Sequence, residues 1–151
     1  MVTNLWPAGD TYQGIFVAEQ VAALRRLGHQ IDVEVVARDR GKLDYLLAAA
    51  RVRRRVRHGS YDVVHVHYGL TALAGSFTGA VPRVLSLHGS DINTGWQRRV
   101  TRLGSRGYAA RTYVSRRLAA AARDPDSDVI PLGVDFELFQ PLDRAAARTG
   151  P

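Results

Sequence analysis

Apolar residues recur along this chain in two kinds of segment, short β-branched runs and longer stretches with helical spacing. The stretch 15–27 places Val17, Val21 and Leu24 at positions i, i+4 and i+7, which is the pattern of one buried helix face. Gly28 follows where a glycine commonly ends a helix. Further helices are predicted over residues 43–58, 69–78, 94–106 and 115–123. Strands are predicted over residues 2–5, 30–37, 61–67, 83–87, 111–114 and 129–131.

The order of these segments alternates strand and helix from one end of the chain to the other. Such alternation predicts a mostly parallel sheet covered by helices on both faces, in a single Rossmann-like, three-layer α/β/α domain. With the common strand order 3-2-1-4-5, the first and fourth strands are neighbours, and the loops that follow them face each other across a cleft. The first strand has room for only about four or five residues, which is short for a central position.

Length and composition fit one folded domain. The chain has 151 residues, of which 46% are hydrophobic, and no apolar run reaches the roughly eighteen residues that cross a bilayer. The N-terminus lacks a signal-peptide pattern, and there is no cysteine, which excludes disulfides and thiolate metal sites and favours a cytoplasmic location. The net charge of +7 favours anionic partners such as nucleic acid, acidic lipids or phosphorylated small molecules.

Polar residues with binding or catalytic chemistry gather in the loop after the strand 83–87. His88, Gly89, Ser90 and Asp91 directly follow the last apolar residue of that strand. His88 is either a site residue or a hydrogen-bonded structural histidine, Gly89 can serve a turn with positive φ, and Asp91 can cap the next helix. Open α/β sheets bind ligands beyond the carboxyl ends of their strands, so the position of this loop favours a site.

A second candidate lies in the loop after the first strand, WPAGDTYQG, which ends in Gly14 at the start of the first helix. Unpaired N–H groups and the helix dipole favour a phosphate at such a position. A plain tight turn explains a single glycine at least as well, so both interpretations stay open.

Two histidines stand close together in the third strand. His65 and His67 occupy positions i and i+2 and therefore point to the same face of the sheet. Such a pair could ligate a metal, but no third ligand is evident. Hydrogen-bonded histidines at the core or at the edge of the cleft are therefore favoured.

Several familiar site signatures are missing. The segment GDTYQGIF has no Lys-Ser/Thr after its second glycine, which argues against a P-loop. Nothing after the first strand matches G-x-G-x-x-G, and the second strand ends without an acidic ribose ligand. The serine of GSFTG stands in the wrong place for a nucleophile elbow. Dehydrogenases, P-loop NTPases and serine hydrolases all become less favoured.

Five segments together resemble the N-terminal domains of family 4 glycosyltransferases, retaining enzymes of the GT-B fold. In chain order these segments are TNLWP…GIFVAEQVAALRRLGHQIDV, DVVHVHYG, VLSLHGSD, TYVSRRL and DVIPLGVDFELFQP. The resemblance covers nearly the whole chain, and LGH and IPLGVDFELFQP are its most specific parts. It implies transfer of a sugar from a nucleotide-sugar donor to a sugar or lipid-linked acceptor. The nucleotide sugar is then a substrate, and no metal or other cofactor is expected.

The resemblance also implies roles for single residues. His88 matches a histidine that reaches the transferred sugar and the acceptor, and Asp91 matches a polar position beside it. Gly14 matches a glycine whose backbone lies near the donor diphosphate; Gln13 precedes it where many relatives carry a second glycine. Ser115 matches a serine that opens the next helix, mainly as a cap. The implied site comprises catalytic His88 and acceptor- or diphosphate-binding Gly14, Gln13, Gly89, Ser90 and Asp91.

The resemblance also divides the chain into parts. Residues 1–131 are expected to form the acceptor-side domain, and residues 132–151 the hinge and the start of an interdomain linker. The family's donor-binding C-terminal domain carries two glutamates eight positions apart. The three glutamates of this chain, Glu19, Glu34 and Glu137, do not fit that spacing. The isolated chain is therefore expected to be inactive.

The segment ARVRRRVRHG is strongly basic. It is either a solvated helix face or a polybasic patch that attracts anionic lipid at the inner membrane face. No aromatic residue interrupts it, which argues against nucleic acid. Its arginines are Arg51, Arg53, Arg54, Arg55 and Arg57.

Two other functions stay open. One is a stand-alone Rossmann-like module that binds a phosphorylated ligand. The other is a half-transferase that pairs with a separate C-terminal chain.

Overall fold

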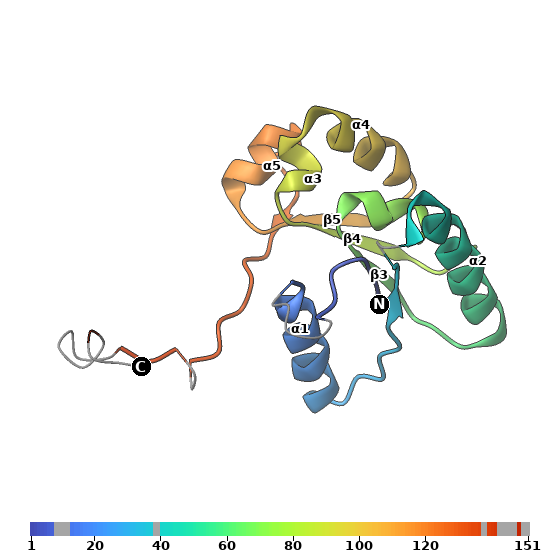
Figure 1. Ribbon diagram of the computed structural model, residues 1–151, viewed down its shortest axis with the longest axis horizontal. Coiled ribbons are helices and arrows are strands. Elements are labelled where there is room, and N and C mark those ends of the chain that lie inside the picture. The colour runs from blue at the N-terminus through green and yellow to red at the C-terminus, as the bar shows by residue number, and fades with distance from the viewer. Residues whose placement is uncertain (8–12, 38–39, 137–138, 142–147, 149–151) are drawn as a thin grey trace.

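The computed structural model describes residues 1–7, 13–37, 40–136, 139–141 and 148. Six parallel strands form one sheet in the order β2-β1-β3-β4-β5-β6 (Figure 1). The fold class is therefore as predicted, an α/β domain with a parallel sheet flanked by helices. The strands are β1 (Val2–Thr3), β2 (Glu34–Val35), β3 (Val64–His67), β4 (Arg83–Leu87), β5 (Ala110–Tyr113) and β6 (Asp128–Val129).

The helices lie on both faces of this sheet, but unequally. In Figure 1, α1 lies alone below the sheet, and the other helices lie above it. They are α1 (Ile15–Arg26), α2 (Lys42–His58), the 3-10 helix η2 (Gly69–Leu73), α3 (Ser90–Asn93), α4 (Gly95–Gly104) and α5 (Arg116–Ala122).

The predicted strand order was wrong. β1 pairs with β2 on one side and with β3 on the other, so β4 is not its neighbour. The chain takes one crossover outward, from β1 to β2, and then reverses. Right-handed crossovers in opposite directions place their helices on opposite faces, which is why α1 is separated from α2 to α5. The winding therefore reverses between β1 and β3, the other common arrangement for this class of sheet.

The predicted helix over 69–78 is only partly helical. Hydrogen bonds such as Ala74 N to Thr71 O (2.9 Å) and Gly75 N to Ala72 O (3.2 Å) join residues three apart, as in a 3-10 helix, and turns follow. A Cβ on Gly69 would lie 1.9 Å from Oγ1 of Thr101, so this segment packs very closely on α4. Small side chains here permit that close approach, which an α-helical spacing pattern does not reveal.

Two predicted helix boundaries, at Gly28 and Ser115, agree with the structure, whereas the helix predicted over 94–106 spans Gly95–Gly104 and a short helix, α3, precedes it. Gly28 has a φ of 91°, and its N–H bonds to the carbonyl of Arg25 (3.0 Å). Ser115 caps α5, because its Oγ accepts a hydrogen bond from Leu118 N (3.2 Å). β2 is much shorter than the predicted 30–37, because an edge strand gains its ladder only from β1, which is itself two residues long.

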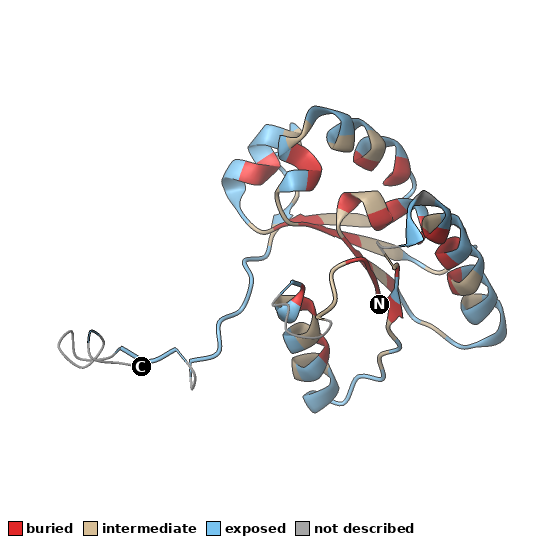
Figure 2. Cartoon of the chain, in the orientation of Figure 1, coloured by how far each residue is buried: buried red, intermediate tan, exposed pale blue. Residues whose placement is uncertain are grey.

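Strand register shows which side chains share a face. Val66 of β3 pairs with Leu85 of β4, and both lie in the apolar cluster on the side of α2. The opposite face carries a polar row across four strands, since Thr3, His67, Ser86 and Thr112 are successive register partners. All four are buried. Figure 2 shows the buried residues concentrated along the strands and on the helix sides that face them.

Candidate active site

The start of α1 lies against the residue that follows β4, although β1 and β4 are not the neighbours that the sequence predicted. The ring of Phe16, in the first turn of α1, lies 4.8 Å from the ring of His88, with 50° between their planes. β3 lies between the two strands, so α1 reaches across it to the end of β4. Of the loop after β1, residues 8–12 are outside the described part of the chain.

Gly14 is required by the backbone of this loop. It is the residue before α1, with φ 82° and ψ 8°, and its carbonyl accepts hydrogen bonds from the N–H groups of Val17 and Ala18. A Cβ would lie only 2.3–2.5 Å from backbone atoms of Leu5 and Trp6. The tight turn considered for Gly14 is therefore present, and its diphosphate role stays a prediction. Gln13, beside it, is exposed.

Asp91 holds the loop after β4 together from the inside. Its side chain is 0% exposed, and its carboxylate accepts hydrogen bonds from the N–H groups of Gly89 (2.7 Å), His88 (3.1 Å) and Gly69 (3.2 Å). Two of these donors directly precede α3, the short helix that contains Asp91, and the third, Gly69, begins η2 after β3. The structure therefore places Asp91 as the buried link between the segments after β3 and β4, and its ligand-binding role stays a prediction.

Gly89 and Ser90 lie on the outer side of the same loop. Gly89 has φ 150° and ψ −73°, a conformation that residues with side chains rarely adopt. Ser90 is exposed, and its Oγ lies 2.8 Å from the hydroxyl of Tyr68. That hydroxyl also donates to Oε1 of Gln97 (3.0 Å). Ser90 is thus accessible to a ligand and already oriented by the loop after β3.

His88 forms a pair with His67 of β3. Nδ1 of His67 lies 3.1 Å from Nε2 of His88, and the rings are 5.3 Å apart with 16° between their planes. We call this contact the histidine pair. The sequence placed His67 beside His65 but did not connect it with His88. The observed β3–β4 register, in which His67 is opposite Ser86, brings the two together.

His65 confirms the prediction of two histidines on one face, because its ring lies 4.3 Å from that of His67. Its Nε2 lies 2.8 Å from Oγ of Ser86, which lies 2.9 Å from Oγ1 of Thr112. His65 is thus hydrogen-bonded, which is the interpretation that the sequence favoured. Within the described residues, no group of three or more His, Cys, Asp or Glu side chains is arranged to hold a metal.

The three imidazoles are held in the neutral form. Burial, together with smaller contributions from the neighbouring His65 and His88, lowers the pKa of His67 to about 2. Burial likewise lowers the pKa of His65 to about 4. The pKa of His88 is also lowered by burial, while the Asp91 carboxylate acts in the opposite direction. At neutral pH the site therefore offers lone pairs and N–H donors rather than positive charge.

Buried polar atoms without a partner gather at the carboxyl ends of the strands. Among the described residues, four buried side-chain atoms lack a hydrogen-bond partner: Asn4 Oδ1, His67 Nε2, Thr71 Oγ1 and His88 Nδ1. Asn4 and His88 directly follow β1 and β4, His67 ends β3, and Thr71 lies in the helix after it. Buried polar groups are normally satisfied, so the unpartnered nitrogens of the adjacent His67 and His88 indicate a place where a polar ligand or water completes the bonding.

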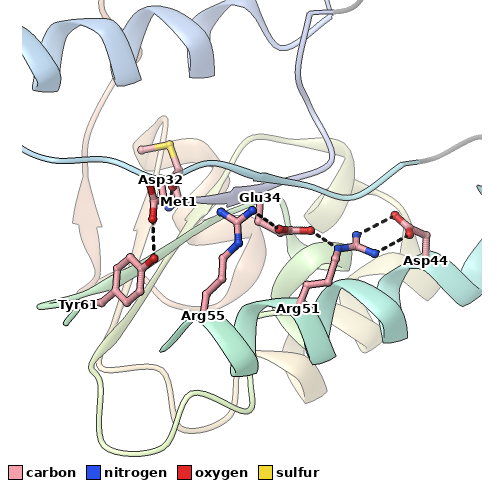
Figure 3. Close-up of polar contacts among 7 residues, drawn as sticks. All are labelled: Met1, Asp32, Glu34, Asp44, Arg51, Arg55 and Tyr61. Carbon is pink, nitrogen blue, oxygen red and sulfur yellow. Dashed lines mark hydrogen bonds and ion pairs between the residues drawn. The ribbon is translucent and has the colours of Figure 1, made fainter. Parts of the chain in front are cut away.

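Two of the five arginines of the basic helix α2, Arg51 and Arg55, form ion pairs with nearby carboxylates. Figure 3 shows Arg51 between two buried carboxylates: it binds Glu34 through Nε, and its Nη1 lies 3.2 Å from Oδ1 of Asp44. Asp44 also accepts a hydrogen bond from Ala37 N (2.6 Å), and Arg51 lowers the pKa of its carboxyl group. Arg55 lies 3.5 Å from Glu34.

The other three arginines of the segment lie on the exposed surface of α2. Arg53, Arg54 and Arg57 are exposed. Arg54 also lines a surface groove of about 440 Å³ with Arg51, Arg55 and His58. The outward charge of α2 therefore comes mainly from three of the five predicted arginines.

The segment after β6, predicted as a hinge, leaves the sheet in an extended path (Figure 1). Leu132, Val134 and Phe136 are exposed, as is Phe139, whose N–H bonds to Asp135 O (2.8 Å). The described part of the chain includes no helix with the length and apolar character needed to span a bilayer.

Comparison with known proteins agrees with this architecture. The family model of Glycosyltransferase Family 4 matches residues 13–138, which include α1, the histidine pair and all strands after β1. No curated protein matches the chain. The matched segment covers most of the sequence and both elements that meet at His88, and the chain therefore belongs to glycosyltransferase family 4.

Proposed function

We propose that this chain is the acceptor-binding domain of a retaining glycosyltransferase that moves a sugar from a nucleotide-sugar donor to a sugar or lipid-linked acceptor. The observation that carries the proposal is the buried, unpartnered Nδ1 of His88 at the carboxyl end of β4, next to the start of α1. A hydroxyl group is both donor and acceptor, so an acceptor hydroxyl can complete the bonding of this nitrogen.

In the proposed reaction this domain has two roles: it stabilises the charge of the leaving diphosphate and it positions the acceptor hydroxyl. The bond between the anomeric carbon and the donor phosphate breaks, the nucleoside diphosphate leaves with the electron pair, and the acceptor oxygen bonds to the same carbon and loses its proton. In the proposal, N–H groups of the first turn of α1, after Gly14, stabilise the charge of the departing diphosphate. His88 positions the acceptor hydroxyl. Gln13, Gly89 and Ser90 are the further ligand contacts in the proposal.

The domain that binds the nucleotide is proposed to lie outside this chain, in a longer protein or in a separate chain, and residues 132–151 to lead towards it. This chain alone is then inactive. The proposed location is the cytoplasm, with peripheral contact at the inner membrane face. The proposal uses no metal or cofactor.

The test is His88→Ala in the protein as its source cell makes it, assayed with radiolabelled nucleotide sugars and a cell-envelope extract as acceptor. We expect transfer to fall by about 100-fold or more, since positioned catalytic groups contribute effects of that size. His29→Ala, at an exposed position, is the matched control. A folded His88→Ala protein with full activity contradicts the proposal.

The alternatives give different results in the same assay. A module that only binds a phosphorylated ligand transfers no sugar in any form of the native protein. A half-transferase is inactive alone and gains activity when a second protein from the same cell is added. An immunoblot of the lysate for the native size separates a longer protein from a chain of 16.6 kDa.

A second surface supports a membrane contact. Arg53, Arg54 and Arg57 are exposed on one helix, and each basic residue near an anionic membrane contributes on the order of 1 kcal/mol. Changing all three to Gln is expected to reduce co-sedimentation with phosphatidylglycerol vesicles by at least 10-fold. The matched control changes the exposed Arg98, Arg99 and Arg102 of α4 to Gln. Equal losses for the two triple variants indicate attraction by net charge and contradict a specific role for α2.

A further inference from the structure

We infer that His67 is a positioning residue for His88: it binds Nε2 of His88 and thereby leaves Nδ1 as the nitrogen that meets the acceptor hydroxyl. The inference rests on the proposed function for the role of His88. The contact between the two rings does not depend on that function. The sequence position of His67 assigned it no part in the site. The inference deepens the proposed function, because it states which nitrogen of His88 contacts the acceptor hydroxyl.

Two contacts hold the ring of His88, and a third holds its backbone. His67 lies at the end of β3, is 1% exposed, and contacts Nε2 of His88 at 3.1 Å. Phe16 packs against the ring from α1 at 4.8 Å. The Asp91 carboxylate accepts the backbone N–H of His88 at 3.1 Å. A side chain fixed in this way keeps its free nitrogen in one place, which is what positioning a substrate requires.

The pair restricts the tautomers of both rings. If His67 donates from Nδ1, then His88 accepts at Nε2, and its own hydrogen must be on Nδ1. If His88 donates from Nε2, then His67 accepts at Nδ1, and its hydrogen must be on Nε2. In both cases the two neutral rings have the same tautomer, both Nδ1–H or both Nε2–H. Mixed tautomers are incompatible with the hydrogen bond.

The two arrangements present opposite chemistry to a ligand. In the first, His88 Nδ1 is a donor, and in the second it is an acceptor that can take the proton of a hydroxyl. When Nδ1 of His88 takes that proton, Nε2–H can pass its own proton to Nδ1 of His67. Because burial keeps the pKa of His67 near 2, a positive charge does not rest on that ring. His67 therefore acts by orienting His88 rather than as a proton store.

His65 serves as the internal control for this inference. Its ring centroid lies 4.3 Å from that of His67, closer than the 5.3 Å of His88, but its Nε2 is bonded to Ser86. Removing His65 therefore changes the surroundings of His67 without touching the His67–His88 contact. If substitutions of His65 and of His67 change His88 equally, the change reflects a general loss of packing and not the loss of the His67–His88 contact.

The experiment is a long-range ¹H–¹⁵N correlation spectrum of the histidine rings of this 151-residue chain, recorded above pH 7. The native chain is expected to show His67 and His88 each in one tautomer, and the same one. His67→Phe keeps a flat ring and removes the bond, so His88 becomes a mixture of tautomers. His67→Asn keeps an amide near the position of Nδ1 and restores a single tautomer. His65→Asn leaves His88 unchanged.

Two outcomes overturn the inference. One is a pair of mixed tautomers in the native chain. The other is an unchanged His88 in a folded His67→Phe chain. If His67→Phe does not fold, His67→Asn and His67→Gln replace it, because the Gln amide reaches too far to occupy the place of Nδ1. In that comparison a single tautomer in both variants overturns the inference.

Activity of the complete native protein supplies the second readout. His67→Phe is expected to lower kcat by about 10- to 100-fold with little change in KM for the donor, and His67→Asn to recover most of it. If His88→Ala leaves transfer intact while the tautomers behave as described, the proposed function fails and the contact stands. If the tautomers do not respond, the positioning role fails whatever the activity of His88→Ala.

Discussion

The two faces of the central sheet differ in the chemistry of their side chains. On the face towards α2, Val66 and Leu85 lie in a continuous apolar cluster that extends into the overlying helices. On the face towards α1, the corresponding row is Thr3, His67, Ser86 and Thr112. Both rows are buried, and they alternate along the same strands, one residue apart.

The apolar face of the sheet therefore contributes most to stability, and the polar face carries the groups with binding chemistry. Apolar burial contributes roughly 25 cal/mol per Å², and it needs no particular geometry. A buried polar row stabilises the fold little in net terms, because each bond replaces one to water, and each missing bond is costly. The face towards α1 nevertheless holds the histidine pair, which the apolar face could not hold without isolating its nitrogens.

The largest expected effect compares neighbours on β4 that point to opposite faces. Leu85→Ala should lower the free energy of unfolding by about 2–5 kcal/mol, because Leu85 is 0% exposed and leaves a cavity. Ser86→Ala should cost about 1–2 kcal/mol, since it leaves His65 Nε2 and Thr112 Oγ1 without a partner. Urea denaturation followed by circular dichroism measures both. A larger loss for Ser86→Ala would reverse the assignment of the two faces.

The next effect concerns how α1 is fixed over the polar face. Gly14→Ala combines a φ of 82° with a Cβ only 2.3 Å from the backbone of Leu5, and we expect a loss of about 3 kcal/mol or more. Gly28→Ala at the other end of α1 has a similar φ of 91° but open space, and should cost about 1–2 kcal/mol. Thermal denaturation of the two variants separates the cost of steric crowding, which only Gly14→Ala has, from the cost of the positive φ, which both have. Equal losses would mean that the close contact is relieved by a small shift.

The third comparison concerns the dependence of stability on pH, to which the histidines of the polar face contribute. Unfolded histidines bind protons below about pH 6.5, while burial holds the pKa of His65 near 4 and that of His67 near 2. The unfolded state then binds more protons, so stability falls as the pH falls from about 6.5 towards 4. His65→Asn should flatten this slope, measured by denaturation at several pH values. His29→Asn, at an exposed position, should not.

Local sequence patterns predicted much of the fold, because they report single segments. The strand Arg83–Leu87 has the predicted bounds, since its apolar run lies between Pro82 and the polar residues from His88 onward. Ser115 begins α5 as its cap and Gly28 follows the end of α1, both as predicted. The length of β2 was overestimated, because apolar alternation does not show how much of a partner strand is available for pairing.

Long-range features were harder to predict, and the candidate site depends on them. Hydrophobic spacing does not show how many crossovers precede the reversal of the winding. The prediction therefore placed β1 beside β4, whereas β3 lies between them. The histidine pair follows from the β3–β4 register, which brings together residues 21 positions apart. Asp91 could be found as a polar residue in the right loop. Its inward direction depends on the N–H groups of Gly69 and Gly89, which no spacing rule supplies.

The carboxylate of Asp91 also couples the motions of two segments of the chain, the one after β3 and the one after β4. Three amide hydrogens, on Gly69, His88 and Gly89, depend on the same two oxygens, although Gly69 lies in a different segment. Neither loop can move far without releasing its share of these bonds. In hydrogen exchange, the three amides should therefore open together and with one free energy. A sugar bound at Ser90 would then slow exchange at Gly69, beyond the loop that it touches.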